Sequence, residues 1–509
     1  MTPVRRWITL PTTRRCWRSP GLSGWSSRPT MCWPGWYDTR MRPAVQPGVP
    51  TLVGSRRVAL TIRQTSISVL AAAASSGARV SVPGTRSAAW RRMPPRDEAG
   101  QEFAMSIAWD EFYSSRVRWL KDSVTMDLRR IMGDPNVISF FAGLPDPALY
   151  PVEDIRLALD HVMAEQGREV LQHAPPAGDG LLKSYLTEKL RRGNVPAQEE
   201  NMLVLSGSIQ GLDLVAEMLL DPGDAVIVED PTFSGALEVF AKYGARFITV
   251  PVDDEGLQVE SLAATLLQQR AKFLYTMPTC HNPTGVDLSL ARRRRLLAIA
   301  REFGLPLVTD DPYGELRYRG TAPPELLALD GEANVIMIGS FSKILAPGLR
   351  LGWLLAPSPV VETLRLEKLS ADRSTNHLVQ RLAAEMARQG MLDRYRETMV
   401  TVYGEKLEAI LAAMRLYFPP AVKWTTPCGG YFIWVTLPVG LDASLLLERA
   451  LAQQVAFIPG ASFFAAGGGE NTLRLCFVNT PLAQIPEGIQ RLGRLITELI
   501  DGCGDDSPA

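Results

Sequence analysis

The 509-residue sequence contains no uninterrupted run of about 18 apolar residues, the length that a helix needs to cross a membrane. We therefore expect no membrane association. Its six cysteines are scattered and include no Cys-x-x-Cys pair, so the sequence predicts neither a disulfide framework nor a zinc site, and we expect no bound metal. Scattered thiols of this kind suit a reducing compartment, so a cytoplasmic location is expected. A hydrophobic content of 46% argues against general disorder.

The sequence also lacks a net charge, but charges of the two signs are unevenly distributed. Residues 1–104 hold sixteen Arg, four acidic residues and no Lys, a net charge of +12, so the rest of the chain carries −12. The same segment holds six of the eleven Trp residues. A basic tail can contact nucleic acid. However, Arg without Lys, beside clustered Trp, Pro, Gly and Ser, is unusual for such an arm, and we expect no nucleic-acid partner.

Three interpretations of residues 1–104 are open. The segment is rich in Arg and Ser and poor in acidic residues, as transit peptides are. It also lacks sustained helical or strand periodicity, as a disordered tail would. We favour a third interpretation, in which the natural start is Met105 and the upstream part is not native, because ordinary globular regularity begins just after that residue.

From about residue 110 the pattern becomes regular, and short apolar runs then alternate with amphipathic helices. This alternation predicts an α/β fold with a mostly parallel sheet covered by helices on both faces. Strands are expected at 137–141, 202–206, 225–229, 247–250, 273–277, 307–309, 335–339 and 350–355. Helices are expected at 123–132, 153–166, 180–192, 208–220, 233–243, 259–269 and 288–303.

After about residue 374 the pattern changes and indicates a smaller α+β domain. A helical stretch reaches residue 412 with a break near Gly390, followed by strands at 431–437 and 472–477 and helices at 444–453 and 486–500. The chain is too long for one ordinary core, which also favours several domains. The expected parts are an irregular extension at 1–104, a segment at 105–150 that belongs with the small domain, a large domain at 151–375, and the small domain at 376–505.

The first candidate functional element is the turn Gly-Ser-Phe-Ser-Lys that follows the strand at 335–339 and ends at Lys343. Most lysines are solvated surface groups. Here the hydroxyls of Ser340 and Ser342 and the nearby Arg350 suit a phosphate group, since Arg offers a planar fork to phosphate oxygens. An amine near cationic and desolvating groups has a lowered pKa, which an imine-forming lysine needs.

Three more candidates also follow apolar strands. Asp310 lies at the carboxyl end of a strand, where ligands collect in open α/β sheets, and an Asp there can pair with a protonated pyridine nitrogen. Asn282, in the run Cys-His-Asn-Pro-Thr-Gly, can donate to a phenolate-type oxygen. Ser208 begins a helix, and main-chain N–H groups at a helix start form an anion site. Taken singly, each has an ordinary explanation as a turn residue or helix cap.

Arg474 is the fifth candidate, because it interrupts an apolar strand of the second domain. A buried Arg needs a paired anion, and a substrate carboxylate would serve, although a structural ion pair is an alternative. Each of the five signals is weak alone. Their order and their places at strand ends favour one shared site.

Residues from about 105 to 505 resemble a class I/II aminotransferase of fold type I, a family that uses pyridoxal 5′-phosphate (PLP). The closest subgroup is that of 2-aminoadipate, kynurenine and aromatic aminotransferases. Two runs carry the resemblance: Ser-Phe-Ser-Lys-Ile-Leu-Ala-Pro-Gly-Leu-Arg-Leu-Gly-Trp at 340–353, and Glu-Asp-Pro-Thr-Phe-Ser-Gly at 229–235. The resemblance implies that the large domain at 151–375 binds PLP.

The resemblance also implies roles for the matching residues. Lys343 would hold PLP as a Schiff base and act as general base, and Asp310 would pair with the pyridine nitrogen. Phe233 would stack on the ring, and Arg474 would take the substrate α-carboxylate. Other matches would contact the ring's O3′ (Asn282 and Tyr313), the phosphate (Ser208, Ile209 through its main chain, Ser340, Ser342 and Arg350) and the substrate (Gly143 and Asn282).

The sequence departs from the family pattern at two positions. The family commonly has Gln where Ile209 stands, so a main-chain contact survives but a side-chain contact does not. A Tyr that reaches the partner subunit's phosphate in the family is replaced by His173, which donates a hydrogen bond as Tyr does but is shorter. Whether His173 takes over that role is open.

The resemblance implies transfer of an amino group from an L-amino acid to a 2-oxo acid, with 2-oxoglutarate as the expected acceptor and ping-pong kinetics. The donor would be of the 2-aminoadipate, aromatic or branched/aliphatic type. Arg116, Arg118 and Arg129 are candidates for binding a distal carboxylate, although exposed Arg side chains are common. A homodimer with shared active sites is also expected.

Three alternatives differ from this function. The same fold hosts lyases and decarboxylases, since fold does not dictate chemistry. An aminotransferase-like transcription regulator would need a winged helix upstream, and residues 1–104 lack two clean amphipathic helices joined by a short turn. A catalytically inactive homologue is disfavoured, because Lys343, Asp310 and Arg474 are all present.

Overall fold

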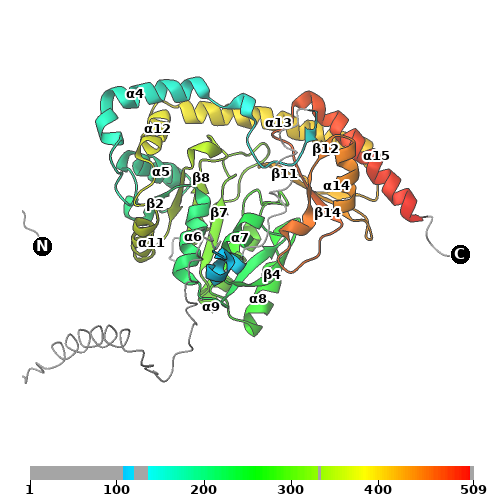
Figure 1. The fold of residues 1–509 in the computed structure, drawn as a ribbon, viewed down its shortest axis with the longest axis horizontal. Helices are drawn as coiled ribbons and strands as arrows, with labels where there is room; N and C mark the ends of the chain where they lie inside the picture. Colours follow the sequence, from blue (N-terminus) through cyan, green and yellow to red (C-terminus); the bar gives the residue numbers. More distant parts are fainter. Residues whose placement is uncertain (1–106, 120–135, 331–333, 505–509) are drawn as a thin grey trace, which may run out of the picture. The chain divides into compact units, whose positions relative to one another are not determined.

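The computed structural model describes residues 107–119, 136–330 and 334–504 (Figure 1). The extension expected at 1–104 and the helix expected at 123–132 lie outside these residues. Among the described helices, none combines the length and the apolar character needed to cross a membrane.

The larger sheet consists of eight strands, which are β2 (Met202–Leu205), β3 (Ala225–Asp230), β4 (Arg246–Asp253), β5 (Gly256–Leu257), β6 (Phe273–Thr276), β7 (Leu307–Asp311), β8 (Val335–Ser340) and β9 (Gly352–Leu355). Their order is β2-β9-β8-β7-β6-β3-β4-β5. Strands β3, β4, β6, β7 and β8 run parallel. β9 runs antiparallel to both β2 and β8, and β5 antiparallel to β4. Every residue of β2, β6, β8 and β9 is buried, as expected for a sheet covered on both faces.

Helices pack around this sheet (Figure 1). Their ends follow local sequence signals: the Asp179 and Ser289 side chains accept hydrogen bonds from main-chain N–H groups of the first turns of α5 and α9, and Gly304 ends α9 in the left-handed conformation. The helices are α2 (Ser115–Trp119), α4 (Val152–Val170), α5 (Gly180–Arg192), α6 (Ser208–Leu219), α7 (Ser234–Lys242), α8 (Val259–Gln268), α9 (Leu290–Phe303), α10 (Leu326–Asp330) and α11 (Ser358–Ala371).

A smaller antiparallel sheet has the order β10-β11-β14-β13. Its strands are β10 (Lys423–Trp424), β11 (Phe432–Thr436), β13 (Ile458–Pro459) and β14 (Thr472–Cys476). The long helix α13 packs against α15, which also packs against α14. β1 pairs in parallel with β12, so the segment before the large sheet is joined to the C-terminal part. The remaining elements are β1 (Ile138–Ser139), β12 (Val455–Ala456), α12 (His377–Arg388), α13 (Met391–Tyr417), α14 (Ala443–Ala452) and α15 (Ile485–Gly504).

The structure changes several expected boundaries. The break expected near Gly390 is confirmed, since Gly390 separates α12 from α13 with φ 66°, a left-handed conformation that suits glycine, but α13 continues beyond the expected residue 412 to Tyr417. The helix expected at 233–243 begins at Ser234, because Phe233 has an extended backbone. Helix α11 was not expected, although it carries a proline in its first turn, a known helix-start signal. The expected strand at 137–141 is only two residues long.

Candidate active site

A cavity of about 740 Å³ lies between the carboxyl edge of the large sheet and the smaller sheet. Open α/β sheets collect ligands at this edge. The structure brings the residues predicted to bind the cofactor and the α-carboxylate into its lining: Gly143, Ser208, Ile209, Phe233, Asn282, Asp310, Tyr313, Ser340, Ser342, Lys343, Arg350 and Arg474. They come from parts of the chain more than 300 residues apart.

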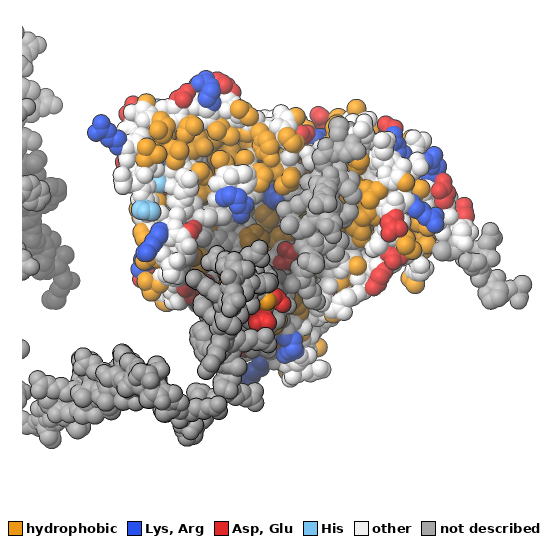
Figure 2. Space-filling view, in the orientation of Figure 1, with side chains coloured by type: hydrophobic (Ala, Val, Ile, Leu, Met, Phe, Trp, Pro, Cys, Tyr) orange, Lys and Arg blue, Asp and Glu red, His pale blue; other side chains and the backbone are white. Residues whose placement is uncertain are grey.

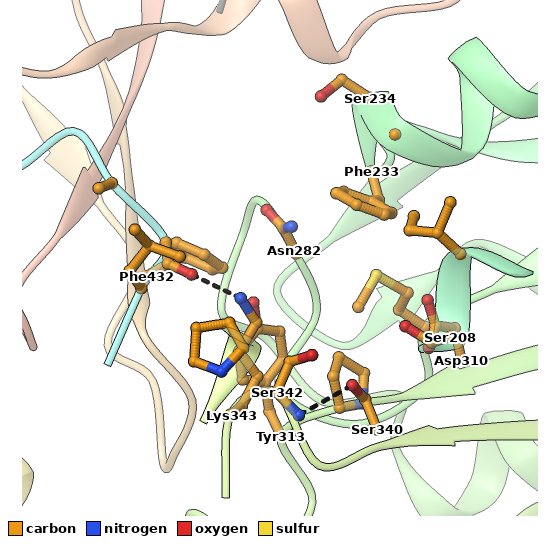
Figure 3. Close-up of a pocket in the computed structure, with 18 of the residues that line it drawn as sticks. Ser208, Phe233, Ser234, Asn282, Asp310, Tyr313, Ser340, Ser342, Lys343 and Phe432 are labelled. Carbon is orange, nitrogen blue, oxygen red and sulfur yellow. Dashed lines mark hydrogen bonds between the residues drawn. The ribbon is translucent and has the colours of Figure 1, made fainter. Parts of the chain in front are cut away.

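Lys343 lies just after β8, and its Nζ donates a hydrogen bond to the main-chain oxygen of Gly143 at 2.6 Å (Figure 3). The Tyr431 hydroxyl donates to the main-chain oxygen of Lys343 at 2.9 Å and so holds the lysine backbone. The pKa of Lys343 is lowered to about 8, mainly by burial. The positive charge of Arg474 also lowers this pKa, whereas Cys476 and Asp310 raise it. An amine with such a pKa has a useful neutral fraction near physiological pH, as a nucleophile or base requires.

Asp310 lies near the end of β7 and is 3% exposed. Its Oδ2 accepts a hydrogen bond from the Tyr275 hydroxyl at 3.2 Å, whereas Oδ1 has no hydrogen-bond partner in the described part of the chain. Burial raises the pKa of Asp310 to about 7. Buried polar atoms are normally satisfied, so a free carboxyl oxygen at a cavity fits a ligand that donates a hydrogen bond to it.

Arg474 on β14 is 6% exposed and faces the same cavity. One Nη donates to the side-chain oxygen of Asn282 at 2.8 Å and the other to the main-chain oxygen of Phe141 at 3.3 Å. Its guanidinium lies 4.1 Å from the ring centre of Phe432 and 4.8 Å from that of Phe463.

No carboxylate of the described residues pairs with Arg474, and its Nε has no hydrogen-bond partner there. Burial lowers the pKa of Arg474 to about 10, which reflects the cost of an uncompensated buried charge. A buried cation without an anion at a cavity wall fits an anionic ligand, and Arg matches a carboxylate with two parallel hydrogen bonds.

Ser208, Ser340, Ser342 and Arg350 form one wall of the cavity. Helix α6 begins at Ser208 without a side-chain cap at Gly207. The Gln210 N–H donates to the Gly207 oxygen, so the N–H groups of Ser208 and Ile209 are the ones that suit an anion. The main-chain N–H of Ser342 donates to the Ser340 hydroxyl at 3.1 Å, which orients this oxygen (Figure 3). This wall fits a phosphate group.

Three further side chains complete the central part of the cavity. Figure 3 shows Phe233 and Asn282 in the upper part of the view, above Asp310 and Tyr313. Tyr313 is 2% exposed, and its ring packs on Tyr431. Burial raises the pKa of Tyr313 well above its usual value, so its hydroxyl stays protonated and can donate a hydrogen bond.

Other candidates lie elsewhere. His173 is exposed and is not part of the cavity lining. The Arg116 guanidinium lies 5.2 Å from the ring centre of Tyr243 and also does not line the cavity. Arg129 and the side chain of Arg118 are outside the described residues.

Sequence reasoning missed Tyr275, Phe432 and Phe463, although they contact Asp310 or Arg474. All three lie in apolar runs, where an aromatic side chain is ordinarily a core residue. Only the pairing of distant strands shows that they face polar groups of the site. The sequence alone offered no signal to single them out.

Comparison with known proteins relates this geometry to a family. The family model for aminotransferase class I and II matches residues 135–492. Aromatic-amino-acid aminotransferase 1 of Thermococcus litoralis is 38% identical over 401 residues, which cover 78% of this chain and 96% of that protein. The 2-aminoadipate transaminase of Thermus thermophilus is 38% identical over 397 residues, which cover 77% of this chain and 98% of that protein.

Solved structures show the same fold. The alpha-aminoadipate aminotransferase of Thermus thermophilus, complexed with N-(5′-phosphopyridoxyl)-L-leucine, aligns with a TM-score of 0.72 and 38% identity over 78% of this chain and all of that chain. The kynurenine aminotransferase of Pyrococcus horikoshii, in complex with PMP, aligns with a TM-score of 0.75 and 38% identity over 77% of this chain and 98% of that chain. The chain therefore has the expected α/β fold of type I.

Proposed function

Because the chain belongs to the class I and II aminotransferases and uses pyridoxal phosphate, we propose that it transfers the amino group of an L-amino acid to a 2-oxo acid in a ping-pong cycle. We further propose 2-oxoglutarate as the acceptor, a cytoplasmic location and a homodimeric state. The observation that carries the proposal is Arg474, a buried cation without an anionic partner in the described chain, in the same cavity as Lys343 and Asp310. These three groups suit an α-carboxylate, an amine and a ring nitrogen.

The residues of the cavity fit pyridoxal phosphate. The unpartnered Asp310 Oδ1 suits a protonated ring nitrogen, and the uncapped start of α6 beside Arg350 suits the phosphate. When bound, the cofactor supplies a reactive aldehyde and an electron-withdrawing ring. The residues proposed to hold it are Asp310 at the ring nitrogen, Asn282 and Tyr313 at the ring oxygen, Phe233 on the ring face, and Ser208, Ile209, Ser340, Ser342 and Arg350 at the phosphate.

The protein residues then divide the work on the amino acid. Arg474 binds the α-carboxylate and fixes the orientation of the substrate, with Asn282 held against it by a hydrogen bond. Lys343, with its lowered pKa, takes the proton from Cα as general base and returns it on the cofactor side. Asp310 keeps a proton at the ring nitrogen, which needs its carboxyl to be ionised. A bound cation favours this state.

The cavity lining favours a donor with an aromatic or aliphatic side chain. Apolar residues surround the substrate side: Phe141, Ala142, Leu144, Ile458 and Phe463. Within the described residues, the cations of the lining are Lys343, Arg350 and Arg474, and each already has a proposed partner. A distal carboxylate, as in 2-aminoadipate, finds no further cation there.

A half-reaction without acceptor tests the proposed function. The holoenzyme is mixed with an L-amino acid alone, over a panel of aromatic, aliphatic and acidic donors. We expect up to one equivalent of 2-oxo acid per active site and conversion of the cofactor to pyridoxamine phosphate, with the largest yield from aromatic or aliphatic donors. Addition of 2-oxoglutarate should restore the cofactor and form glutamate.

The control for this experiment is Lys343→Ala, which removes the proton-transfer group and should lose nearly all of the half-reaction. Release of carbon dioxide or loss of the donor's side chain in place of 2-oxo acid would identify a decarboxylase or lyase and contradict the proposal. Full activity of Lys343→Ala would contradict the role of the lysine.

A further inference from the structure

A buried polar network lies directly behind the turn at Gly207 and Ser208, which leads into α6 and belongs to the proposed phosphate site. Lys368 on α11 is 0% exposed, and its Nζ donates to both carboxyl oxygens of Asp372 at 2.7 Å and to the side-chain oxygen of Gln210 at 3.1 Å. The Gln210 amide nitrogen donates to Asp372 Oδ2 at 2.8 Å. The network therefore joins α11 to the first turn of α6. A buried lysine is costly unless it is paired and hydrogen-bonded, and both conditions are met here.

The network ends on Ser206, the residue before the turn. The Ser206 main-chain N–H donates to the Gln210 side-chain oxygen at 2.8 Å, and its hydroxyl donates to Asp372 Oδ2 at 2.8 Å. Its main-chain oxygen lies 3.5 Å from an Nη of Arg350. The backbone N–H, the hydroxyl and the carbonyl of Ser206 are thus all engaged from the protein side.

Beyond this residue, Gly207 lies against the side chain of Arg350. Gly207 has φ 96°, and a Cβ atom at this position would lie 2.3 Å from an Nη of Arg350. The turn therefore passes against the guanidinium that forms part of the phosphate wall. Ser206, Gln210, Lys368 and Asp372 do not line the cavity, so they act on the turn from behind.

We propose that Gln210, Lys368 and Asp372 are positioning residues that hold Ser206 and thereby fix the first-turn N–H groups of α6 and Arg350 in the geometry that binds the cofactor phosphate. This inference rests on the proposed cofactor site. A turn that is ordered before the anion arrives loses less conformational entropy on binding, which raises affinity for the phosphate without a direct contact.

The test compares pyridoxal phosphate with pyridoxal, which lacks the phosphate. Full-length protein is stripped of cofactor, and the dissociation constant of each compound is measured by fluorescence and by the absorbance of the bound form. In Lys368→Met and Gln210→Met, we expect the constant for pyridoxal phosphate to rise roughly tenfold, the effect of one lost hydrogen bond to a charged group, while that for pyridoxal is unchanged. The same holoenzyme variants should release their cofactor faster on dilution.

The matched control is Lys406→Met. Lys406 is 3% exposed and pairs with Asp146 at 2.7 Å and with the main-chain oxygen of Val478 at 2.6 Å, away from the turn. The Lys406→Met variant should lose about as much stability as Lys368→Met, but the ratio of its dissociation constants for pyridoxal phosphate and pyridoxal should stay that of the wild type. Ser206→Ala removes only the hydrogen bonds of the hydroxyl, to Asp372 and to the Thr375 hydroxyl, and supplies a milder variant if Lys368→Met does not fold.

The inference is overturned if affinities for the two compounds fall in parallel, since that is the effect of a general structural change, or if neither changes in Gln210→Met and Ser206→Ala. If the wild-type protein binds pyridoxal as tightly as pyridoxal phosphate, the phosphate contributes nothing to the affinity. This result would contradict the proposed phosphate site itself and not the network behind it.

Discussion

Burial sets the reactivity of Lys343, and this leads to a pH prediction. Only the neutral amine attacks an aldehyde, and burial with Arg474 nearby lowers the pKa of Lys343 to about 8 from 10.5. The neutral fraction therefore grows as the pH rises through about 8 and levels off above it. We expect the rate at which the cofactor-free protein takes up pyridoxal phosphate, followed by stopped-flow absorbance, to show a midpoint near pH 8.

The same pH series with a free lysine derivative removes the contribution of the cofactor's own ionisations. Once the rate of the free amine is corrected for its own pKa of about 10.4, the ratio of the two rates isolates Lys343. In Arg474→Met, the loss of a positive charge should move the midpoint to higher pH, because one cause of the lowered pKa is gone. A wild-type midpoint near 10.5 would show that Lys343 is not desolvated as the structure describes.

For individual residues, the sequence was enough to predict those whose chemistry is unusual for their position. Lys343 and Asp310 follow apolar strands, and Arg474 interrupts one, so each stood out without coordinates. Tyr275 did not, because a tyrosine in an apolar strand has nothing unusual about it. Its contact with Asp310 depends on β6 lying beside β7, which is a property of the sheet and not of the local sequence.

Buried charged side chains link separate helices. Asp179, at the start of α5, links this helix to α12. Its Oδ1 accepts from the main-chain N–H of Leu181, and its Oδ2 accepts from Arg381 at 2.5 Å and contacts His377 on α12 at 3.2 Å. Burial alone would raise the pKa of Asp179, but the hydrogen bonds and charge of Arg381 outweigh it, so the pKa is lowered.

A carboxyl group whose pKa is lower in the folded state than in the unfolded state, where it is about 4, stabilises the fold at pH values above about 4. This contribution is lost as the pH falls through the pKa of the folded state. We expect Asp179→Asn to destabilise the protein by roughly 3 kcal/mol at pH 7, because Arg381 loses its buried anion and keeps only the exposed Glu169 as an anionic partner. In urea denaturation, the difference from wild type should shrink as the pH falls below about 4. Asp160→Asn, at an exposed ion pair, is the control and should change little. Equal stability of Asp179→Asn and wild type at pH 7 would refute the coupling.

The type of most elements followed from the sequence, but their limits depended on contacts. The break near Gly390 was predicted, but the end of α13 at Tyr417, beyond the predicted residue 412, was not, and α13 packs against α15. Strands β12 and β13 are each two residues long. β12 forms because it pairs with β1, which is more than 300 residues away in the sequence. Periodicity in a short window carries no information on such a partner.

For the whole molecule, alternating strands and helices predicted a mostly parallel sheet and a second, smaller unit of structure. The order of the strands did not follow from the pattern. β9 lies between β2 and β8 and runs antiparallel to both, although the sequence gives it the same apolar character as the parallel strands. The direction of a strand is set by how the chain returns to the sheet. This part of the fold was not predictable from composition or periodicity.

One surface supports the proposed homodimer. Figure 2 shows hydrophobic side chains gathered beside α4 and over α12. Helix α4 itself exposes Val152, Leu157 and Met163, which are 70%, 45% and 42% exposed. Exposed apolar side chains that gather in one patch on a folded chain mark an interaction surface. A second copy of the chain is the partner that the proposed function calls for.

We therefore expect light scattering after size-exclusion chromatography to give twice the 56.0 kDa chain mass at micromolar concentration. Val152 and Met163 are eleven residues apart, three helical turns, and so share one face of α4. The double variant Val152→Asp with Met163→Asp places charges on this face and should shift the mass toward that of one chain. Leu267→Asp is the control, because Leu267 is 79% exposed on α8, outside this surface. A monomeric wild type would contradict the dimer. A double variant that remains dimeric would place the interface elsewhere, since two buried carboxylates cost several kcal/mol without partners.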